Sequence, residues 1–397
     1  MPQSKVTYVD EADIKNKRVL LRADFDVSLN PNYTIADDAR IRNNLPTLKY
    51  LLKNHNRLIC VAKLDRPKAR DPKLSLKVVV KRLQIYFPKY KIQLIEDFLK
   101  SASEKIFLKQ TSNEILLLEN IRFYPEEKQN DLAFAKKLAG FADVYVNDAF
   151  AMCHRSEASI TGVPKYLPSY GGLLLKKEIE TISKAVKKPK KPFVAIIGGA
   201  KIETKINLIS KLTEMADYVL VGGGLANTFL CAHGYEIGKS YCEYEKVAKA
   251  RQLLFLAAQK HTAIVLPLDV VIGDPKNNEN GGTVVKVDQI PKGAVALDIG
   301  PETKAKFGSI IAKAKTIIWN GPIGYFENPA FRRGTDFIYY AITENRDAVS
   351  IVGGGDTLSA ISKEEYLDRI THISTGGGAM LEFIEKGTLP GIEALKK

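Results

Sequence analysis

Short apolar runs rich in β-branched residues alternate with segments of helical period along the whole chain. Several of these runs are continuously apolar, which is typical of strands covered on both faces in parallel sheets. The pattern therefore predicts an α/β fold built from doubly wound, parallel, Rossmann-like sheets. The predicted strands are Arg18–Arg22, Arg57–Ala62, Lys91–Ile95, Glu114–Leu118, Asp143–Val146, Phe193–Ile197, Asp217–Val221, Ala263–Leu266, Ala294–Leu297, Thr316–Trp319, Ala348–Val352 and Ile370–Ile373.

A break in the pattern divides the chain into two halves. The turn-forming segment Leu167–Gly172 is followed by an amphipathic stretch, Leu173–Val186, and then by the basic, proline-interrupted Lys187–Pro192. We interpret these as a hinge helix and a linker between two domains. Phe141–Val146 resembles Met215–Leu220, which indicates the same helix-to-strand passage in both halves. The predicted parts are an N-terminal domain (1–170), a connecting helix and linker (171–192), a C-terminal domain (193–375) and a C-terminal segment (376–397).

Length, charge and cysteine usage narrow the class of protein. A chain of 397 residues is too long for one ordinary core, in agreement with two domains. No apolar run approaches the roughly 18–20 residues of a membrane helix, residues 1–13 are too polar for a signal peptide, and the four cysteines lack metal-ligand spacing. We therefore expect a cytoplasmic protein without a membrane partner. The net charge of +14 would suit small polyanions, and because no nucleic-acid-binding motif accompanies it, we expect no nucleic-acid partner.

The residues that follow the predicted strands differ between the halves. In open α/β sheets, ligands bind beyond the carboxyl ends of the strands. In the first half these positions carry arginines and carboxylates: Arg22, Asp24, Arg40, Arg66, Arg122, Asn147, Asp148 and Arg155. In the second half they carry glycine runs: Gly198–Gly199, Gly222–Gly224, Gly353–Gly355 and Gly376–Gly378.

Both sets of residues suit phosphate. Arginine offers a planar fork of donors, and a glycine run lets backbone N–H groups approach an oxyanion. A single glycine run is also an ordinary tight turn, and a single arginine is by default a surface residue. There is no G-x-x-x-x-G-K-[ST] motif, and Asn227 stands where a dinucleotide fingerprint needs its third glycine or alanine. We expect a small polyanion and a nucleotide brought together by domain closure.

The motifs resemble those of the phosphoglycerate kinase family over essentially the whole chain. Each motif is weak alone, but their order and spacing together are specific. They are Arg22–Val27, Asp37–Arg42, Leu118–Pro125, Val144–Phe150, Gly198–Lys201 with Lys205, Gly222–Thr228, Leu297–Pro301, Trp319–Pro322 with Glu327, Gly353–Thr357 and Thr375–Ala379.

The resemblance implies a role for each matching residue. The substrate site of the N-terminal domain would comprise Asp24, Asp26, Arg40, Lys63, Arg66, Arg122 and Arg155. The nucleotide site of the C-terminal domain would comprise Lys205, Gly300, Glu327, Gly354, Gly355, Asp356 and Thr357. Arg40 and Lys201 would be catalytic, Glu327 would bind the ribose, and Asp356 would be the Mg²⁺ ligand. Lys201 and Lys205 also have the spacing of an exposed helix face.

The resemblance also implies the reaction. It is the reversible, Mg²⁺-dependent transfer of a phosphoryl group from 1,3-bisphosphoglycerate to ADP, giving 3-phosphoglycerate and ATP in glycolysis or gluconeogenesis. Arg40 and Lys201 would neutralise charge on the transferring group after hinge-bending closure. The family precedent is a monomer, with segment 376–397 packing near the N-terminal domain. A nicotinamide dehydrogenase is a poorer reading because the dinucleotide fingerprint is incomplete.

The chain departs from the family pattern in its substrate site. Asp26 and Ser28 replace the Asn and Pro of D-x-N-x-P, Lys63 and Asp65 replace the His and Gly of H-L-G-R-P, and Glu157 replaces the last His of G-T-A-H-R-A-H. Two interpretations stay open. Either these carboxylates pair locally, with Lys63 on Asp65 and Asp26 on Arg22 or Arg42, or the chain is a nucleotide-binding family member with a weakened or altered acyl-phosphate substrate, or a regulatory role.

Overall fold

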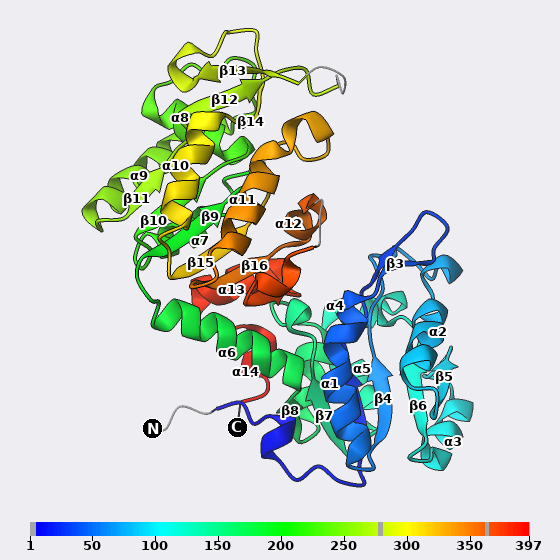
Figure 1. Cartoon of the computed structure of the whole chain (residues 1–397). Coiled ribbons are helices and arrows are strands. Elements are labelled where there is room, and N and C mark those ends of the chain that lie inside the picture. Colours follow the sequence, from blue (N-terminus) through cyan, green and yellow to red (C-terminus); the bar gives the residue numbers. More distant parts are fainter. Residues whose placement is uncertain (1–4, 277–280, 362–364, 397) are drawn as a thin grey trace. The chain divides into compact units, whose positions relative to one another are not determined.

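The computed structural model describes residues 5–276, 281–361 and 365–396. It contains two compact units (Figure 1), of which unit 1 is Met1–Glu180 with Thr388–Lys397 and unit 2 is Thr181–Gly387. Gly391 N–H donates to the carbonyl of Cys153 at 2.8 Å, so the end of the chain is tied into unit 1. The predicted domain boundaries at residues 170, 192 and 375 stay predictions.

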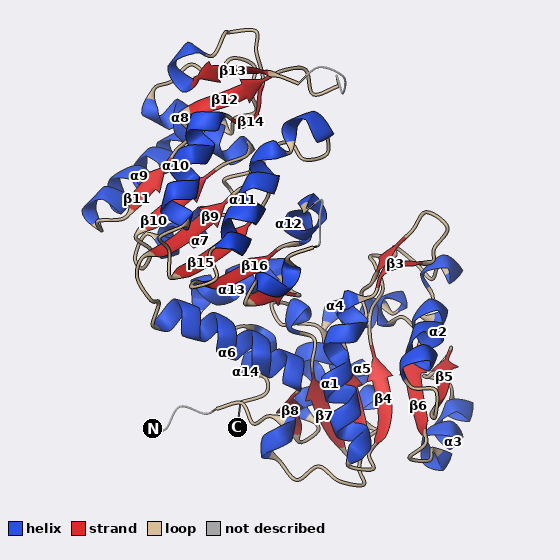
Figure 2. Ribbon diagram, viewed as in Figure 1, coloured by secondary structure: helices blue, strands red, loops and turns tan. Residues whose placement is uncertain are grey.

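Unit 1 is built on a parallel six-stranded sheet in the order β5-β6-β4-β1-β7-β8. Its strands are apolar and largely buried, because helices cover both faces (Figure 2). The strands are β1 (Arg18–Arg22), β4 (Arg57–Val61), β5 (Lys91–Ile95), β6 (Glu114–Leu118), β7 (Val144–Asn147) and β8 (Ser169–Gly171), beside a short hairpin of β2 (Ser28–Leu29) and β3 (Ile35–Asp37). The helices of unit 1 are α1 (Ala39–Lys53), α2 (Lys77–Tyr86), α3 (Ser101–Lys109), α4 (Pro125–Gln129), α5 (Leu132–Ala139) and α14 (Pro390–Glu393), and α6 (Leu173–Lys187) begins in this unit.

Unit 2 repeats the architecture with a second parallel six-stranded sheet, ordered β11-β10-β9-β15-β16-β17. Its strands are β9 (Phe193–Ile197), β10 (Tyr218–Val221), β11 (Ala263–Val265), β15 (Thr316–Asn320), β16 (Val349–Gly353) and β17 (His372–Ser374). Its helices are α7 (Ile206–Leu212), α8 (Gly224–His233), α9 (Val247–Gln259), α10 (Pro301–Ile311), α11 (Arg333–Glu344), α12 (Gly355–Ala360) and α13 (Gly377–Lys386). The predicted class, two doubly wound parallel sheets, is confirmed.

The passage predicted to occur twice has the same hydrogen bonds in both units. Asp143, before β7, accepts the backbone N–H of Arg18 at 2.8 Å, and Asp217, before β10, accepts that of Phe193 at 2.6 Å. In each case the acid satisfies the first N–H of the neighbouring central strand, β1 or β9. The two aspartates thereby help set the register at the amino ends of both sheets.

One predicted strand belongs to a different sheet. The segment predicted at Ala294–Leu297 forms β14 (Ala296–Ile299), which pairs antiparallel with β12 (Asp269–Ile272), itself antiparallel to β13 (Thr283–Lys286). This small sheet is half exposed, so its strands lack the continuous burial of the central ones. The predicted strand at 294–297 is therefore present two residues further along, but it lies outside the two parallel sheets.

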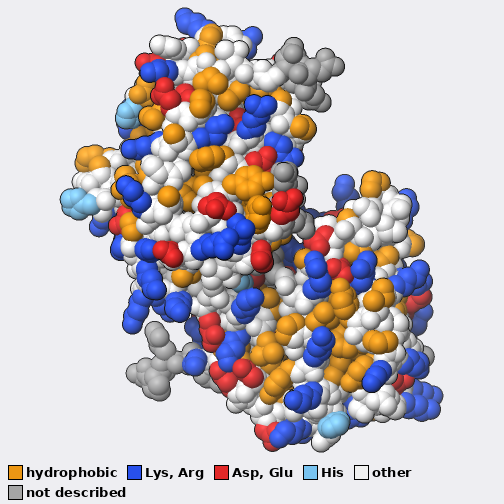
Figure 3. Space-filling model, in the orientation of Figure 1, with side chains coloured by type: hydrophobic (Ala, Val, Ile, Leu, Met, Phe, Trp, Pro, Cys, Tyr) orange, Lys and Arg blue, Asp and Glu red, His pale blue; other side chains and the backbone are white. Residues whose placement is uncertain are grey.

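Two surface properties bear on partners. Within the described residues, no helix has both the length and the apolar character needed to cross a bilayer. On the face shown in Figure 3, Lys and Arg side chains are interspersed with Asp and Glu over both units. On that face the net positive charge is distributed and does not form one basic patch.

Candidate functional site

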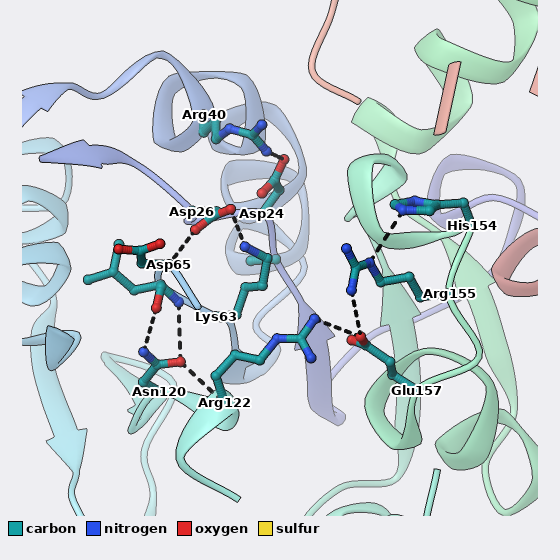
Figure 4. A network of polar contacts seen from close by, with 12 residues as sticks. Asp24, Asp26, Arg40, Lys63, Asp65, Asn120, Arg122, His154, Arg155 and Glu157 are labelled. Carbon is teal, nitrogen blue, oxygen red and sulfur yellow. Dashed lines mark hydrogen bonds and ion pairs between the residues drawn. The ribbon is translucent and has the colours of Figure 1, made fainter. Parts of the chain in front are cut away.

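The candidate substrate site in unit 1 lies at the carboxyl ends of the central strands. Arg22 at the end of β1 is in register with Val61 on β4 and with Asn147 on β7, so the segments that follow these strands begin level with one another. Asp24 and Asp26 follow β1, and Lys63 follows β4. Figure 4 shows these side chains with Arg40, Arg122 and Arg155 facing one another, as expected at the edge of a parallel sheet.

Asp24 and Arg40 form an ion pair that a buried asparagine supports. Arg40, in the first turn of α1, donates to Asp24 Oδ2 at 2.5 Å, and the Asp24 side chain is only 2% exposed. Asn44, one turn further along α1, accepts the N–H of Asp24 at 3.2 Å and donates to the carbonyl of Arg40 at 2.9 Å. Asp24 is the principal cause of a raised Arg40 pKa. Arg40 is thus held as a permanent cation, still one-third exposed at the site.

Asp26, Lys63 and Asp65 are joined by hydrogen bonds to the Asp26 carboxylate. Lys63 Nζ donates to Asp26 Oδ2, and the backbone N–H of Asp65 donates to Asp26 Oδ1 at 2.7 Å. Asp65 has φ +56°, a left-handed conformation that glycine favours and that Asp tolerates better than most residues. Lys63 therefore pairs with Asp26 and not with Asp65, and Asp26 turns to Lys63 and not to Arg22 or Arg42. Burial lowers the pKa of Lys63, an effect that Asp26 opposes.

Arg122 and Arg155 meet at the carboxylate of Glu157. Arg122, in a 3-10 turn after β6, donates from Nη2 to Glu157 Oε1 at 2.6 Å, and both side chains are buried (3% and 5% exposed). Arg155 Nη1 lies 3.7 Å from the same oxygen and is 41% exposed. Asn120 positions the turn by accepting the N–H of Arg122 at 3.1 Å and that of Leu64 at 3.2 Å. Arg66 is exposed in the loop beyond Lys63.

The candidate nucleotide site in unit 2 begins with a pocket of about 400 Å³. Its walls come from the segments that follow β9, β10 and β15 and from β14, and they are mainly backbone and apolar side chains. The polar side chains include Asn227, Tyr241, Asp298, Tyr325 and Glu327, of which Glu327 is exposed at the rim. Gly300 lies one residue beyond the wall formed by Asp298 and Ile299, where it precedes α10. An apolar slot with few polar groups is typical of a small-molecule site.

Lys205 lies beside this pocket, over the ends of β9 and β15. Its Nζ donates to the carbonyl of Gly198 at 2.6 Å and to Asn320 Oδ1 at 2.7 Å. Burial lowers the pKa of Lys205 to about 8, although Asp356 acts in the opposite direction. Gly321 makes this position possible, because it has φ +91° and an added Cβ would lie 2.7 Å from Lys205 Nζ and 2.3 Å from the carbonyl oxygen of Gly198.

The other predicted nucleotide residues lie at the end of β16 and after β9. Gly354, with φ +114°, precedes α12, in which Gly355, Asp356 and Thr357 form the first turn. Asp356 is exposed, and within the described residues no three acidic, His or Cys side chains cluster as a metal site. A single carboxylate fits a hard cation that takes its other ligands from phosphate and water. Lys201 is exposed before α7, so it does not share a helix face with Lys205.

Sequence reasoning assigned no role to four side chains that position the predicted ones. Asn44, Asn120 and Asn320 hold Arg40, Arg122 and Lys205 respectively, and Glu157 pairs with Arg122. Asn120 and Asn320 lie inside the quoted motifs, directly after predicted strands, and this placement was the available signal. Asn44 also accepts the N–H of Asp24 and Glu157 accepts from Arg122, and these partners lie on other segments, so spacing along the chain did not indicate the contacts.

Comparisons with known proteins identify the family to which the chain belongs. The family model described as phosphoglycerate kinase matches residues 9–387. Relatives named phosphoglycerate kinase include one from Dictyoglomus turgidum, 47% identical over 395 residues and 99% of both chains, and a cytosolic one from Nicotiana tabacum, 43% identical over 396 residues, covering 99% of this chain and 98% of the relative. The structure of phosphoglycerate kinase from Coxiella burnetii matches with a TM-score of 0.86 and 38% identity over 98% of both chains. The matches extend over nearly the full length of the chain, and the chain belongs to the phosphoglycerate kinase family.

Proposed function

We propose that this chain catalyses the reversible transfer of a phosphoryl group from 1,3-bisphosphoglycerate to ADP, giving 3-phosphoglycerate and ATP. Membership of the phosphoglycerate kinase family carries this proposal. The cationic site in unit 1 and the apolar pocket with its buried lysine in unit 2 support it. The proposal includes a cytoplasmic location, in line with the cytosolic tobacco relative, and a monomeric state on the family resemblance alone.

The proposed roles follow from the charge and position of each residue. Arg40, Arg66, Arg122 and Arg155 bind the anionic groups of the glycerate, and Arg40 also stabilises charge on the phosphoryl group as it transfers. The pocket bounded by Glu327 holds base and ribose, and Lys205 holds a nucleotide phosphate. Lys201, which is exposed in the segment that follows β9, is the second catalytic cation. Asp356 would hold Mg²⁺, which when bound neutralises phosphate charge.

Turnover in the ATP-forming direction tests the proposal. Purified protein supplied with 1,3-bisphosphoglycerate, Mg²⁺ and ADP should form ATP in a coupled assay. Retained ADP binding without turnover would reject the activity and leave the nucleotide site standing.

An altered substrate is the second candidate function, because Asp26 brings a carboxylate to a site for anions and engages Lys63. A carboxylate about 5 Å from a bound anion costs roughly 3 kcal/mol at an effective dielectric near 20. If the altered-substrate reading holds, Asp26→Asn combined with Lys63→His should improve 3-phosphoglycerate affinity markedly. Wild-type turnover together with unchanged affinity in that double variant would remove this candidate.

Nucleotide affinity should fall as the pH rises above about 8. The Lys205 pKa of about 8 in the empty site means that the ammonium is present below this pH and is lost above it. Because only the ammonium attracts phosphate, ADP affinity measured by calorimetry should be nearly level from about pH 6.5 to 7.5 and decline by up to about tenfold per unit above pH 8.

Arginine substitution provides the check on this assignment. Lys205→Arg keeps its charge to higher pH and should remove the alkaline decline, whatever its effect on affinity at neutral pH. Lys211→Arg, at an exposed lysine paired with Glu214, is the matched control and should behave as wild type. The same decline in Lys205→Arg as in wild type would show that another group titrates.

A further inference from the structure

Glu157 occupies the place in unit 1 where two predicted substrate-binding arginines converge. Its Oε1 accepts from Arg122 Nη2 at 2.6 Å and lies 3.7 Å from Arg155 Nη1 (Figure 4). One carboxylate oxygen thus bridges two guanidinium groups, as one oxygen of a bound phosphate would. The carboxylate belongs to the same chain, so an anion arriving at these arginines meets a resident negative charge.

The Arg122–Glu157 contact leaves hydrogen-bonding capacity unused. A fork-to-fork pair would use two guanidinium nitrogens and both carboxylate oxygens. Among the described residues, neither Arg122 Nη1 nor Glu157 Oε2 has a hydrogen-bond partner, although both atoms are buried. Buried ionised atoms without partners are costly, so this pair is not the arrangement that best satisfies Arg122. A ligand that supplies further acceptors would satisfy it better.

The other charged side chains near Glu157 make their hydrogen bonds to other groups. Glu127 on α4 accepts the N–H and Oγ–H of Ser159, and Arg22 at the end of β1 donates to Ser159 Oγ, so these two charges bind through Ser159. His154 Nε2 lies 3.3 Å from Arg155 Nε. Arg122 and Arg155 are therefore the cations that Glu157 contacts, and the three groups together carry one net positive charge.

We propose that Glu157 is a built-in counter-anion that the phosphate of the substrate must displace from Arg122 and Arg155, so that it determines which anions the site accepts. This inference rests on the proposed function, which places the phosphate of 3-phosphoglycerate in unit 1. While the site is empty, Glu157 neutralises a buried arginine. When phosphate binds, the carboxylate and the phosphate are like charges beside the same two arginines, and this disfavours the dianion.

Proton uptake follows from this competition. A phosphate monoester loses its second proton near pH 6, so the free ligand is mostly a dianion at neutral pH. Beside the Glu157 carboxylate a phosphate monoanion binds more favourably than the dianion, and binding should therefore take up a proton and strengthen as the pH falls. A site without the carboxylate prefers the dianion, and its affinity should instead strengthen as the pH rises.

Titration of 3-phosphoglycerate into wild type and Glu157→Gln tests the proposal. Calorimetry at pH 6.5 and 8.0, in buffers of different ionisation enthalpy, measures both affinity and proton uptake. Wild type should bind roughly 20- to 30-fold more tightly at pH 6.5 than at pH 8.0, as uptake of close to one proton requires. Glu157→Gln should bind roughly 10- to 100-fold more tightly than wild type at pH 8.0 and show the opposite pH trend with little uptake.

Two further variants keep the test decisive. Glu157→Leu also removes the carboxylate without adding a titratable group and should act like Glu157→Gln if the latter folds poorly, with the far-ultraviolet circular dichroism spectrum as the check on folding. Asp143→Asn disrupts an acid–arginine pair with Arg18 at the opposite end of the same sheet and should leave both measurements unchanged within about twofold.

The contrary outcomes are distinguishable. Weaker binding of Glu157→Gln at both pH values, with no proton uptake by wild type, would make Glu157 a mere support for Arg122 and overturn the inference while the proposed function stands. Failure of wild type to bind 3-phosphoglycerate would reject the proposed function and the inference with it.

Discussion

Replacing Arg122 with leucine should lower the free energy of unfolding of unit 1 by about 3–5 kcal/mol, because it leaves the carboxylate of Glu157 buried without its principal counter-ion. The two side chains are only 3% and 5% exposed, so water cannot replace the lost guanidinium. The exposed ion pairs of the protein should contribute far less, about 0–1 kcal/mol each. The expected loss of stability therefore arises because the Arg122–Glu157 pair is buried, and removing one charge from an exposed pair should not cause it.

The measurement must separate the two units. The single tryptophan, Trp319, is buried in unit 2, so its fluorescence follows that unit, whereas far-ultraviolet circular dichroism follows both. In urea, Arg122→Leu should shift the dichroism transition to lower concentration and largely spare the fluorescence transition.

A charge-free pair is the control for this prediction. Arg122→Leu combined with Glu157→Leu removes both buried charges and should recover most of the lost stability, because an apolar pair often replaces a buried ion pair at little cost. If the double variant is no more stable than Arg122→Leu alone, lost packing and not the unpaired carboxylate is the cause.

Replacing Arg40 with alanine should reduce kcat by roughly 10²–10³-fold, since one donor aimed at developing charge contributes about that much in enzymes that transfer charged groups. Arg40 is held at the site by Asp24 Oδ2 at 2.5 Å and by Asn44, which accepts the N–H of Asp24 and donates to the carbonyl of Arg40. A preorganised cation does not have to be oriented during the reaction, so its loss should appear in kcat more than in KM.

Arg42 is the matched control for Arg40. It lies two residues further along α1 and is 57% exposed, where it pairs with Asp37 and Asp38. Arg42→Ala should keep kcat within about twofold of wild type, and Arg40→Lys should fall between the two because it retains the charge but not the fork. An equal loss for Arg40→Ala and Arg42→Ala would mean that disturbance of α1, and not loss of a specific cation, limits the rate.

Local sequence patterns predicted the framework because they reflect local physics. The strands β1, β5, β6 and β9 agree residue for residue with the predicted ones. β1, β6 and β9 are buried and mainly apolar because both faces are covered, whereas β5 is a partly exposed edge strand. Strands of two to four residues were predicted only in part: β10 and β11 were found, whereas β2, β3, β8, β12 and β13 were not, because alternation is hard to recognise over so few positions. The placement of β14 in an antiparallel sheet depends on β12, some 25 residues earlier, and no pattern within β14 encodes it.

For the candidate sites, too, local patterns predicted some residues and missed others. Residues that follow strands, such as Arg22, Asp24 and Arg122, were found because the carboxyl edge of a parallel sheet collects them, whereas Lys63 and Lys205 came from the family resemblance. Their partners were not all found. Lys63 was expected to pair with nearby Asp65, but it donates to Asp26, 37 residues earlier in the chain, and the backbone N–H of Asp65 donates to the same carboxylate.

The sequence by itself determined that this protein has two doubly wound parallel sheets, that its motifs are those of phosphoglycerate kinases, and which strand ends carry charge or glycine. These properties depend on the order of residues and on short-range periodicity. Only the tertiary structure decided which charges meet: Asp26 with Lys63, Glu157 with Arg122 and Arg155, and Lys205 with Asn320. The physical reason is that Coulomb energy and hydrogen bonding depend on distance in space, and the partners are brought within 4 Å by the packing of separate strands and loops.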